Sequence, residues 1–330
     1  MRNYIFTFLV FLFLNSCTSS KKDFKVTGNK NEYAVGFSIS EVGKLTKLTV
    51  YSPWEGAGHE KFDYYLSSGN EQIDTLENVI HVPVKRVICL STTHVPYIKA
   101  LNETNTVIGL SGAEYVYDST IYNRYVNKEI IDVGYGQNIN YEQIVKMNPD
   151  IIFAYGVGSE VVGFVNRLKD MGIPVILNAE YLEHTPLGKA EWIKFISRFY
   201  CKEETGDSIF NSIRTNYLEL KKIADTCSFR PRIMTGLPFK EQWWVPGGKS
   251  HLSNLIHDSG ADYLWKNNQS EESFVVSIEE MILNASDADY WIFTSGIKDL
   301  KGITDFDSRF SIFRPYKEGN VFNSDKRLSK

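Results

Sequence analysis

Short apolar runs that alternate with amphipathic segments dominate the middle of the chain. The runs are rich in Val, Ile and Leu, and they occupy residues 86–90, 106–110, 130–133, 150–154 and 173–177. Compact runs of this kind are typical of parallel strands that are buried on both faces. Helix-like segments at 141–147 and 159–170 stand between them, and Gly172 is placed to end the second. Strands that alternate with helices predict βα units on a mostly parallel sheet.

The alternation is interrupted once. Residues 191–200 and 203–226 carry apolar side chains at helical spacing, and the second segment would form one helix about 36 Å long. After Pro231 the alternation resumes and continues to residue 294. The pattern predicts an α/β fold: two α/β lobes with mostly parallel sheets, joined by one long α-helix.

The region before residue 84 has a different pattern. Strand-like pieces at 47–51 and 62–66 are separated by Gly, Asn and Pro, which predicts β-hairpins placed before the first lobe. The predicted organisation is a signal peptide (1–16), a lipid-anchored tether with a β-hairpin extension (17–83), an N-terminal α/β lobe (84–190), a helical segment that includes the bridging helix (191–229) and a C-terminal α/β lobe (230–330).

The first seventeen residues have the pattern of an export signal. Arg2 is followed by an apolar stretch over residues 5–14, which is too short to span a bilayer because spanning takes about 20 apolar residues. Leu14-Asn15-Ser16-Cys17 resembles a bacterial lipobox, which makes Cys17 the predicted lipidation site; an ordinary secretory signal with a chance cysteine is the alternative. Several acyl chains anchor a protein firmly. We therefore expect an exported protein, lipid-anchored to the cell envelope on its periplasmic side.

Composition excludes several classes of protein. The 330 residues exceed one typical domain of about 150 residues, and the net charge of −4 comes with no basic block, which disfavours nucleic acid as a partner. Four cysteines cannot form a disulfide-dense scaffold. Cys201 and Cys227 flank the long helix, so they would lie about 40 Å apart and should not form a disulfide.

Motifs for catalysis are absent from the sequence. There is no GxSxG or HExxH pattern. The Gly247-Gly248-Lys249-Ser250 stretch lacks the first glycine of a phosphate-binding loop, because Trp243 stands there. The six histidines are scattered and are interpreted as structural or solvent-facing. We predict a protein that is not an enzyme, with no catalytic residue, no bound metal and no cofactor.

Aromatic and small polar residues gather where the predicted strands end. In open α/β sheets, ligands bind outside the carboxyl ends of the strands. One aromatic residue in a loop is more often packing than a ligand contact, but several at one edge favour a flat, polycyclic or metal-complex ligand held by stacking. The candidate ligand-binding residues are Thr92, Thr93, His94, Tyr115, Tyr135, Tyr155, Trp243, Trp244 and Phe274.

A weak internal repeat relates the two lobes. Residues 140–144 lead to a strand at 150–153, and residues 277–281 lead similarly to a strand at 289–293. Glu142 and Glu279 occupy equivalent places in the first turn of the two helices. By themselves both are ordinary N-terminal residues, because an acidic side chain there suits the helix dipole.

Three motifs together resemble a known family. Arg86 to Ser91, Asn140-x-Glu142 running to Ile152, and Val276-Ser277-x-Glu279 resemble class III (helical-backbone) substrate-binding proteins of ABC importers for iron–siderophore, heme and vitamin B12. The resemblance covers about residues 83–323. It implies that the bridging helix is rigid and that there is a ligand cleft between the lobes. It also implies a monomer without catalysis that captures an iron chelate, heme or cobalamin in this cleft and delivers it to an ABC permease.

The resemblance also implies roles for single residues. Glu142 and Glu279 match the positions that dock onto arginines of the permease. Tyr155 matches directly an aromatic residue in the ligand cleft of the family's vitamin B12-binding member. Tyr135, Trp244 and Phe274 match other aromatic residues of that cleft with a shift of about one residue.

Two alternatives stay open at this point. One is an exported hydrolase acting on a cell-envelope or glycan substrate, with His94 and His251 among its catalytic groups. The other is a binder of a bare metal ion, for which His94, His184 and His251 would have to converge.

Overall fold

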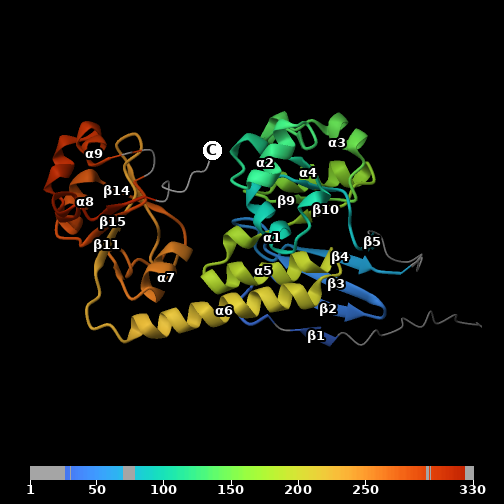
Figure 1. Ribbon diagram of the computed structural model, residues 1–330, viewed down its shortest axis with the longest axis horizontal. Coiled ribbons are helices and arrows are strands. Elements are labelled where there is room, and N and C mark those ends of the chain that lie inside the picture. The colour runs from blue at the N-terminus through green and yellow to red at the C-terminus, as the bar shows by residue number, and fades with distance from the viewer. Residues whose placement is uncertain (1–26, 30, 70–78, 295–296, 298, 324–330) are drawn as a thin grey trace, which may run out of the picture.

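A single unbroken helix joins two α/β lobes in the computed structural model, which describes residues 27–29, 31–69, 79–294, 297 and 299–323. Helix α6 (Glu203–Asp225) runs along the base of both lobes (Figure 1). The predicted bridging helix is thereby confirmed, ending one residue earlier than expected. The predicted signal peptide and Cys17 lie outside the described residues.

The first lobe is built on a parallel sheet in the order β10-β9-β6-β7-β8. Its strands are β6 (Val87–Cys89), β7 (Val107–Leu110), β8 (Ile131–Asp132), β9 (Ile151–Ala154) and β10 (Val175–Leu177). Its helices are α1 (Val95–Ala100), α2 (Ser119–Val126), α3 (Tyr141–Met147) and α4 (Glu160–Asp170). Every residue of β6, β9 and β10 is buried, as the continuous apolar runs predict.

The second lobe repeats this plan with a shorter sheet. Its parallel strands, in the order β13-β11-β15-β16, are β13 (Asp262–Tyr263), β11 (Arg232–Thr235), β15 (Tyr290–Ile292) and β16 (Val321–Phe322). A separate antiparallel pair consists of β12 (Trp243–Val245) and β14 (Phe274–Val276). The helices are α7 (His251–Asp258), α8 (Ile278–Ala285), α9 (Leu300–Phe306) and α10 (Arg314–Glu318).

The internal repeat extends to single hydrogen bonds. The order β7-β6-β9-β10 of the first lobe corresponds to β13-β11-β15-β16 of the second. In the first lobe Asp150 Oδ2 accepts from the backbone N–H of Arg86 at 2.9 Å, and the Arg86 guanidinium donates to carbonyls at the end of α3. In the second lobe Asp289 Oδ2 accepts from the N–H of Arg232 at 2.7 Å, and Arg232 donates to a carbonyl of α8. Both lobes therefore use the same device to fix a helix against its strand.

A third sheet precedes the first lobe in sequence. Strands β1 (Thr27–Asn29), β2 (Phe37–Val42), β3 (Leu45–Tyr51) and β4 (Lys61–Ser67) pair antiparallel in chain order, which confirms the predicted hairpins, and β5 (Val79–His81) pairs parallel with β4. The sheet is not a loose appendage. Phe37 packs its ring against Trp192 and Phe195 of α5 (Pro186–Arg198), at centroid distances of 4.8 and 5.4 Å, so it shares the core of the first lobe.

Two buried carboxylates of the first lobe hold the start of this sheet. Glu191 accepts from the backbone N–H groups of residues 32–34 at 2.8–3.0 Å. Glu183 accepts from the N–H groups of Val35 and Gly36 and from the Trp192 indole. Burial opposes ionisation of Glu191, but the backbone hydrogen bonds and Lys194 outweigh it and lower the pKa of this carboxyl. The segment 32–36 is therefore tied rigidly to α5.

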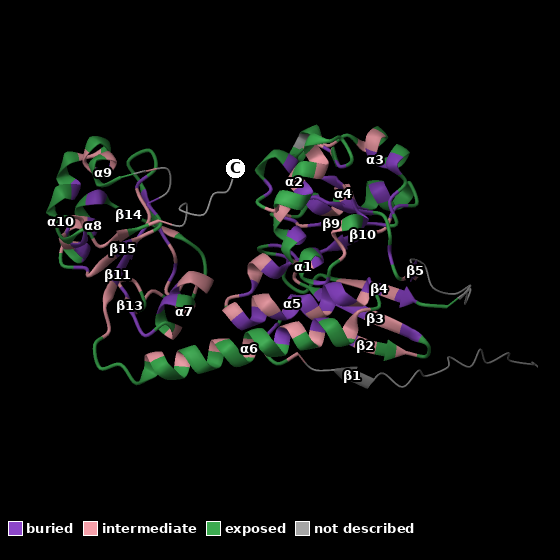
Figure 2. Cartoon of the chain, in the orientation of Figure 1, coloured by how far each residue is buried: buried purple, intermediate pink, exposed green. Residues whose placement is uncertain are grey.

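Helix α6 contacts one lobe with each half. Its first half packs on α5, which is buried, whereas most of α6 is exposed (Figure 2). Near its other end, Tyr217 Oη donates to Asp258 of α7 at 2.8 Å and Lys221 Nζ contacts the same carboxylate at 2.5 Å. The described part of the chain contains no helix with the length and hydropathy needed to cross a bilayer.

Gly206 sets the distance between α5 and α6, and its substitution tests the helix anchorage. An alanine Cβ there would lie 2.5 Å from Ser197 Oγ and 2.6 Å from Ser197 Cβ. We expect Gly206→Ala to lower the free energy of unfolding by about 1–3 kcal/mol, because overpacking outweighs the gain in helix propensity. Urea unfolding measures this.

Gly163 of α4 provides the matched control, because a Cβ there meets nothing within 4 Å. Gly163→Ala should stabilise the protein by up to ~1 kcal/mol. Equal stabilisation by both substitutions would show that the contact between α5 and α6 is loose.

Candidate functional site

The carboxyl ends of the first lobe's strands surround a cavity of about 650 Å³. It is lined by residues that follow β6, β7, β8 and β9, namely Leu90, Ser91, Thr92, Ser111, Gly112, Glu114, Tyr115, Asp132, Gly134, Tyr135, Asn138 and Tyr155. Its size is within the range of ordinary small-molecule sites. The cavity lies at the edge where parallel α/β sheets bind ligands.

Four of the predicted ligand-binding residues meet in this cavity: Thr92, Tyr115, Tyr135 and Tyr155. We call the three aromatic residues among them, Tyr115, Tyr135 and Tyr155, the tyrosine shelf. Tyr155 donates from its hydroxyl to that of Tyr135 at 2.9 Å, while 68% of Tyr115 and 65% of Tyr135 are exposed. The shelf thus presents uncovered aromatic surface.

Hydrogen bonds and one glycine position the shelf. Asp132 accepts from the N–H of Ala113 at 3.0 Å and from that of Gly134 at 2.8 Å, which fixes the loops that carry Tyr115 and Tyr135. Gly134 has a φ of +83°, and a Cβ there would lie 2.2 Å from the Asn138 carbonyl oxygen. No other residue fits this turn, so the glycine is required to present Tyr135.

The hydroxyl of Tyr155 stays protonated at neutral pH. Burial, and then the hydrogen bond with Tyr135, raise the pKa of Tyr155 to about 12. The shelf therefore offers the neutral hydroxyl of Tyr155 and aromatic faces to a ligand.

Thr93 and His94 do not join the shelf. Thr93 is exposed beside the cavity and donates its N–H to Ser91 Oγ at 3.2 Å. The prediction that His94 contacts the ligand is wrong, because its side chain is only 1% exposed. Its ring packs edge-on against that of Phe153, with 6.2 Å between the ring centroids. Neither ring nitrogen has a hydrogen-bond partner, and burial lowers the pKa of His94 to about 3. The 3₁₀ turn before α1 directs this side chain into the core.

The predicted aromatics of the second lobe are placed differently. The prediction for Trp243 is wrong: it is 0% exposed, its ring packs among Trp291, Phe310 and Phe313, and its indole N–H donates to the Thr235 carbonyl. Side chains alternate along a strand, so Trp244, its neighbour on β12, is 50% exposed.

Phe274 is half-buried against Trp265, at a centroid distance of 5.9 Å. Within the described part of the chain, neither Trp244 nor Phe274 lines the shelf cavity or the inter-lobe cavity described next.

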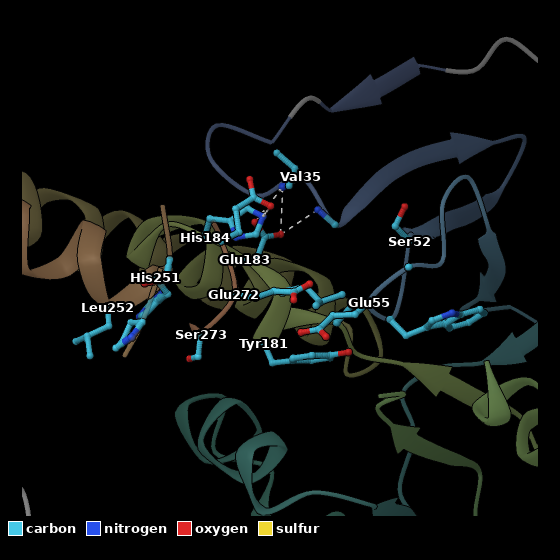
Figure 3. A pocket seen from close by; sticks show the side chains of 18 of the residues that line it. Val35, Ser52, Glu55, Tyr181, Glu183, His184, His251, Leu252, Glu272 and Ser273 are labelled. Carbon is cyan, nitrogen blue, oxygen red and sulfur yellow. Dashed lines mark hydrogen bonds and ion pairs between the residues drawn. The ribbon is translucent and has the colours of Figure 1, made fainter. Parts of the chain in front are cut away.

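An inter-lobe cavity of about 610 Å³ lies between the N-terminal sheet, the segment after β10 and the second lobe (Figure 3). It is lined by Val35, Gly36, Tyr51, Ser52, Trp54, Glu55, Gly56, Ala179, Tyr181, Leu182, Glu183, His184, Pro246, Ser250, His251, Leu252, Glu271, Glu272 and Ser273. The sequence predicts a cleft between the lobes, but none of the predicted ligand-binding residues lines this cavity. The rule that selected Tyr155 would also have selected Tyr181, which follows β10.

The two cavities are neighbours. The rings of Tyr155 and Tyr181 meet edge to face at a centroid distance of 6.4 Å, one in each lining. The Tyr181 hydroxyl donates to the Gly156 carbonyl. The shelf cavity and the inter-lobe cavity therefore share a wall of two tyrosines.

The histidines proposed for a hydrolase site or a bare-metal site, His94, His184 and His251, do not converge. His184 and His251 line the inter-lobe cavity, where His184 Nε2 lies 3.2 Å from Glu271 Oε2, but His94 is in the core. Among the described residues, no group of three His, Cys, Asp or Glu side chains could hold a metal ion. The three-histidine site is therefore not formed.

Glu142 and Glu279 occupy matching places in the two lobes. Each is exposed in the first helical turn, of α3 and α8 respectively, and the caps of these helices are Asn140 and Ser277. Glu279 forms an ion pair with Arg309 at 3.1 Å. An exposed pair of this kind contributes at most about 1 kcal/mol, so Glu279 is readily available to another partner.

Comparison with known proteins identifies the family. Residues 87–326 match the periplasmic binding protein family, and the chain belongs to it. Proteins of this family bind substrates for transport and are not enzymes, which removes the hydrolase alternative. The chain is 30% identical over 271 residues, or 79% of its length, to an uncharacterized lipoprotein of Methanocaldococcus jannaschii, and it spans 64% of that relative.

Solved structures share the fold at low sequence identity. A possible iron-binding (periplasmic solute-binding) protein from Staphylococcus epidermidis superposes with a TM-score of 0.58 at 17% identity, covering 74% of this chain and 91% of that one. The periplasmic vitamin B12 binding protein of Vibrio cholerae superposes with a TM-score of 0.51 at 18% identity. The match covers 73% of this chain and 88% of that one. These likenesses establish two α/β lobes of the class III type.

The burial of His94 predicts an acid-sensitive contribution to stability. In the unfolded chain this histidine takes up a proton below about pH 6.5. In the folded chain it stays neutral until the pH falls to about 3. Stability is therefore lost as the pH falls through this window, by at most ~1.4 kcal/mol per pH unit from this residue.

We expect His94→Leu to match or exceed the wild-type stability at neutral pH, because it removes two buried nitrogens without partners. The variant should also lose less stability on acidification, measured by urea unfolding at about pH 7 and about pH 5. The same substitution at exposed His59 is the control. An unchanged acid response in His94→Leu would contradict the neutral, buried state of this ring.

Proposed function

We propose that this periplasmic binding protein is an extracytoplasmic, lipid-anchored protein that captures a metal chelate and delivers it to an ABC permease. The chelate is an iron siderophore, heme or a corrinoid. The observation that carries the proposal is the tyrosine shelf, which offers exposed aromatic rings at the carboxyl edge of the first lobe.

The chemistry of the shelf suits such a ligand. Aromatic faces stack against flat or polarisable surfaces, and such contacts contribute about 0.5–1.5 kcal/mol each beyond the area they bury. Tyrosine hydroxyls can donate hydrogen bonds to the oxygen atoms of a chelate. Among the described residues that line the shelf cavity, none pairs a strong nucleophile with a base, which agrees with binding rather than reaction.

The arrangement of the lobes suits delivery. Because α6 is one continuous helix anchored at both ends, the lobes are expected to close by small motions only. Glu142 and Glu279 are the proposed docking residues, one on each lobe, for arginines of the permease. Charged pairs across such a surface mainly set the orientation and the rate of encounter.

Export and anchoring rest on the first seventeen residues. Cys17 is the proposed lipidation site, and the lipoprotein relative of Methanocaldococcus jannaschii supports this assignment. A tethered monomer would hold the captured chelate close to the membrane that contains the permease.

Substitution of the shelf tests the proposed ligand site. We expect Tyr135→Ala and Tyr155→Ala each to weaken binding of the chelate on the order of tenfold, because each removes one stacking surface. Quenching of Trp fluorescence during titration with ferric siderophores, heme and cobalamin measures the affinity. Tyr117→Ala is the control, since Tyr117 is 78% exposed and does not line the cavity. Lack of quenching by every chelate, or full affinity in both shelf variants, would refute the proposal.

Charge reversal tests the docking surface separately. Glu142→Lys combined with Glu279→Lys should abolish uptake in cells of the native host and leave chelate affinity in vitro unchanged, because both residues lie outside the two cavities. Glu160→Lys combined with Glu280→Lys is the matched control, as these are also exposed first-turn glutamates. Loss of affinity in the first double variant, or normal uptake, would rule out a docking role.

A further inference from the structure

We propose that the second lobe docks onto the permease through an exposed apolar surface beside Glu279, and that Arg309 competes with an arginine of the permease for this glutamate. The first lobe offers Glu142 without such a competitor. This inference rests on the proposed function and adds the chemistry of the surface that the permease presents to each lobe.

The two docking glutamates have different surroundings, although they occupy equivalent places in α3 and α8. In the described part of the chain, the carboxylate of Glu142 has no hydrogen-bond or ion-pair partner. The carboxylate of Glu279 accepts from Nη1 of Arg309 at 3.1 Å, while 75% of the Glu279 side chain remains exposed. Figure 1 shows both helices well away from α6, so the bridging helix covers neither glutamate. The same position of the repeat thus carries a free charge in the first lobe and a paired charge in the second.

Asp307 fixes the orientation of Arg309. Its carboxylate accepts from the Arg309 backbone N–H at 2.9 Å, which caps the 3₁₀ helix η6 (Ser308–Ile312). The same carboxylate accepts from Nε and Nη2 of the Arg309 guanidinium at 3.1 and 2.8 Å. Paired hydrogen bonds of this kind hold a planar guanidinium in one orientation, and they lower the pKa of Asp307. Nη1 of Arg309 is thereby directed to Glu279.

Exposed apolar side chains flank this ion pair. Leu283 stands one turn after Glu279 on α8, so both side chains lie on the same face of the helix. Leu283 is 81% exposed, more than any other large apolar side chain in the described part of the chain. Ile312 stands three residues after Arg309 in η6, where side chains at this spacing eclipse, and it is 45% exposed. Phe306, the last residue of α9, is 54% exposed. We call Leu283, Phe306 and Ile312 the apolar patch.

The equivalent surface of the first lobe is more polar. Lys146 takes the place of Leu283, because it stands one turn after Glu142 on α3, and it is exposed. The most exposed apolar side chain of α3 is Val145, at 45%. The two lobes therefore present unlike chemistry at equivalent positions.

These differences define the surface that the permease must present. An arginine that approaches Glu279 meets the like charge of Arg309, and like charges repel. Arg309 uses only Oε1 of Glu279, so the other oxygen stays accessible, and docking is weakened rather than blocked. Burial of apolar side chains drives association, and a few of them carry most of the binding free energy of an interface. We therefore expect the permease to meet the second lobe with an apolar surface around its arginine, and the first lobe mainly with charge.

Serine substitutions at the two equivalent positions test the apolar patch. Full-length Leu283→Ser and Lys146→Ser replace the native copy in host cells and are produced in limiting amounts. The initial rate of uptake is measured with ferrioxamine B and heme that contain radioactive iron, and with cyanocobalamin that contains radioactive cobalt. Leu283→Ser should lower the rate on the order of tenfold, whereas Lys146→Ser should keep it within about twofold. Chelate affinity in vitro should stay unchanged in both, because neither residue lines the shelf cavity or the inter-lobe cavity.

Removal of Arg309 should have the opposite effect. Arg309→Gln should raise the uptake rate at limiting amounts of protein by up to about fivefold, because Glu279 is then free for the permease. In a Glu279→Gln background the same substitution should change nothing, which a purely structural role of Arg309 would not predict. Lys301→Gln is the matched control, because it removes another exposed positive charge of the second lobe, paired with Asp305 at 2.6 Å, and it should leave the rate unchanged.

Wild-type uptake in Leu283→Ser, or an unchanged or lower rate in Arg309→Gln, would overturn the inference and leave the proposed function standing. A dimer that native mass spectrometry detects in the wild type and not in Leu283→Ser would assign the apolar patch to a second copy of the chain, and would overturn the inference as well. If wild-type cells take up no chelate beyond the level of cells that lack the protein, both the inference and the proposed function fail. Thermal unfolding of each variant checks that it is folded.

Discussion

The structure depends on one constraint: a single helix that spans both lobes and is held at each end. Close packing of Gly206 on Ser197 joins the first half of α6 to the first lobe, and Asp258 of α7 binds Tyr217 and Lys221 near its other end. A straight helix cannot shorten, because its backbone hydrogen bonds fix the rise per residue. The separation of the lobes, and with it the space between them, follows from this element.

Within that frame the first lobe carries most of the proposed ligand site. Its strands end in three tyrosines around one cavity, and its N-terminal sheet, tied down by buried Glu183 and Glu191, walls a second. The second lobe contributes Pro246, Ser250, His251 and Leu252, among others, to the wall of the inter-lobe cavity.

Periodicity in the sequence was enough to predict the strands, the helices and the tyrosine shelf, because burial of a parallel sheet imposes a pattern on neighbouring residues. Periodicity did not predict the direction in which individual side chains point. His94 follows a predicted strand, and Trp243 lies in β12, a strand that was not predicted. Both side chains point inward, since a turn or a one-residue step reverses the direction of a side chain. A cleft between the lobes was predicted, but the residues that line it were not, because Val35, Tyr181 and Glu272 meet only through tertiary packing.

Native mass spectrometry of the full-length protein, released gently from membranes of its own host, tests the central claim most directly. The account predicts one copy of the chain carrying one metal-containing chelate, with the mass increment and isotope pattern of iron or cobalt. A bound sugar, peptide or other metal-free compound in place of the chelate would contradict it.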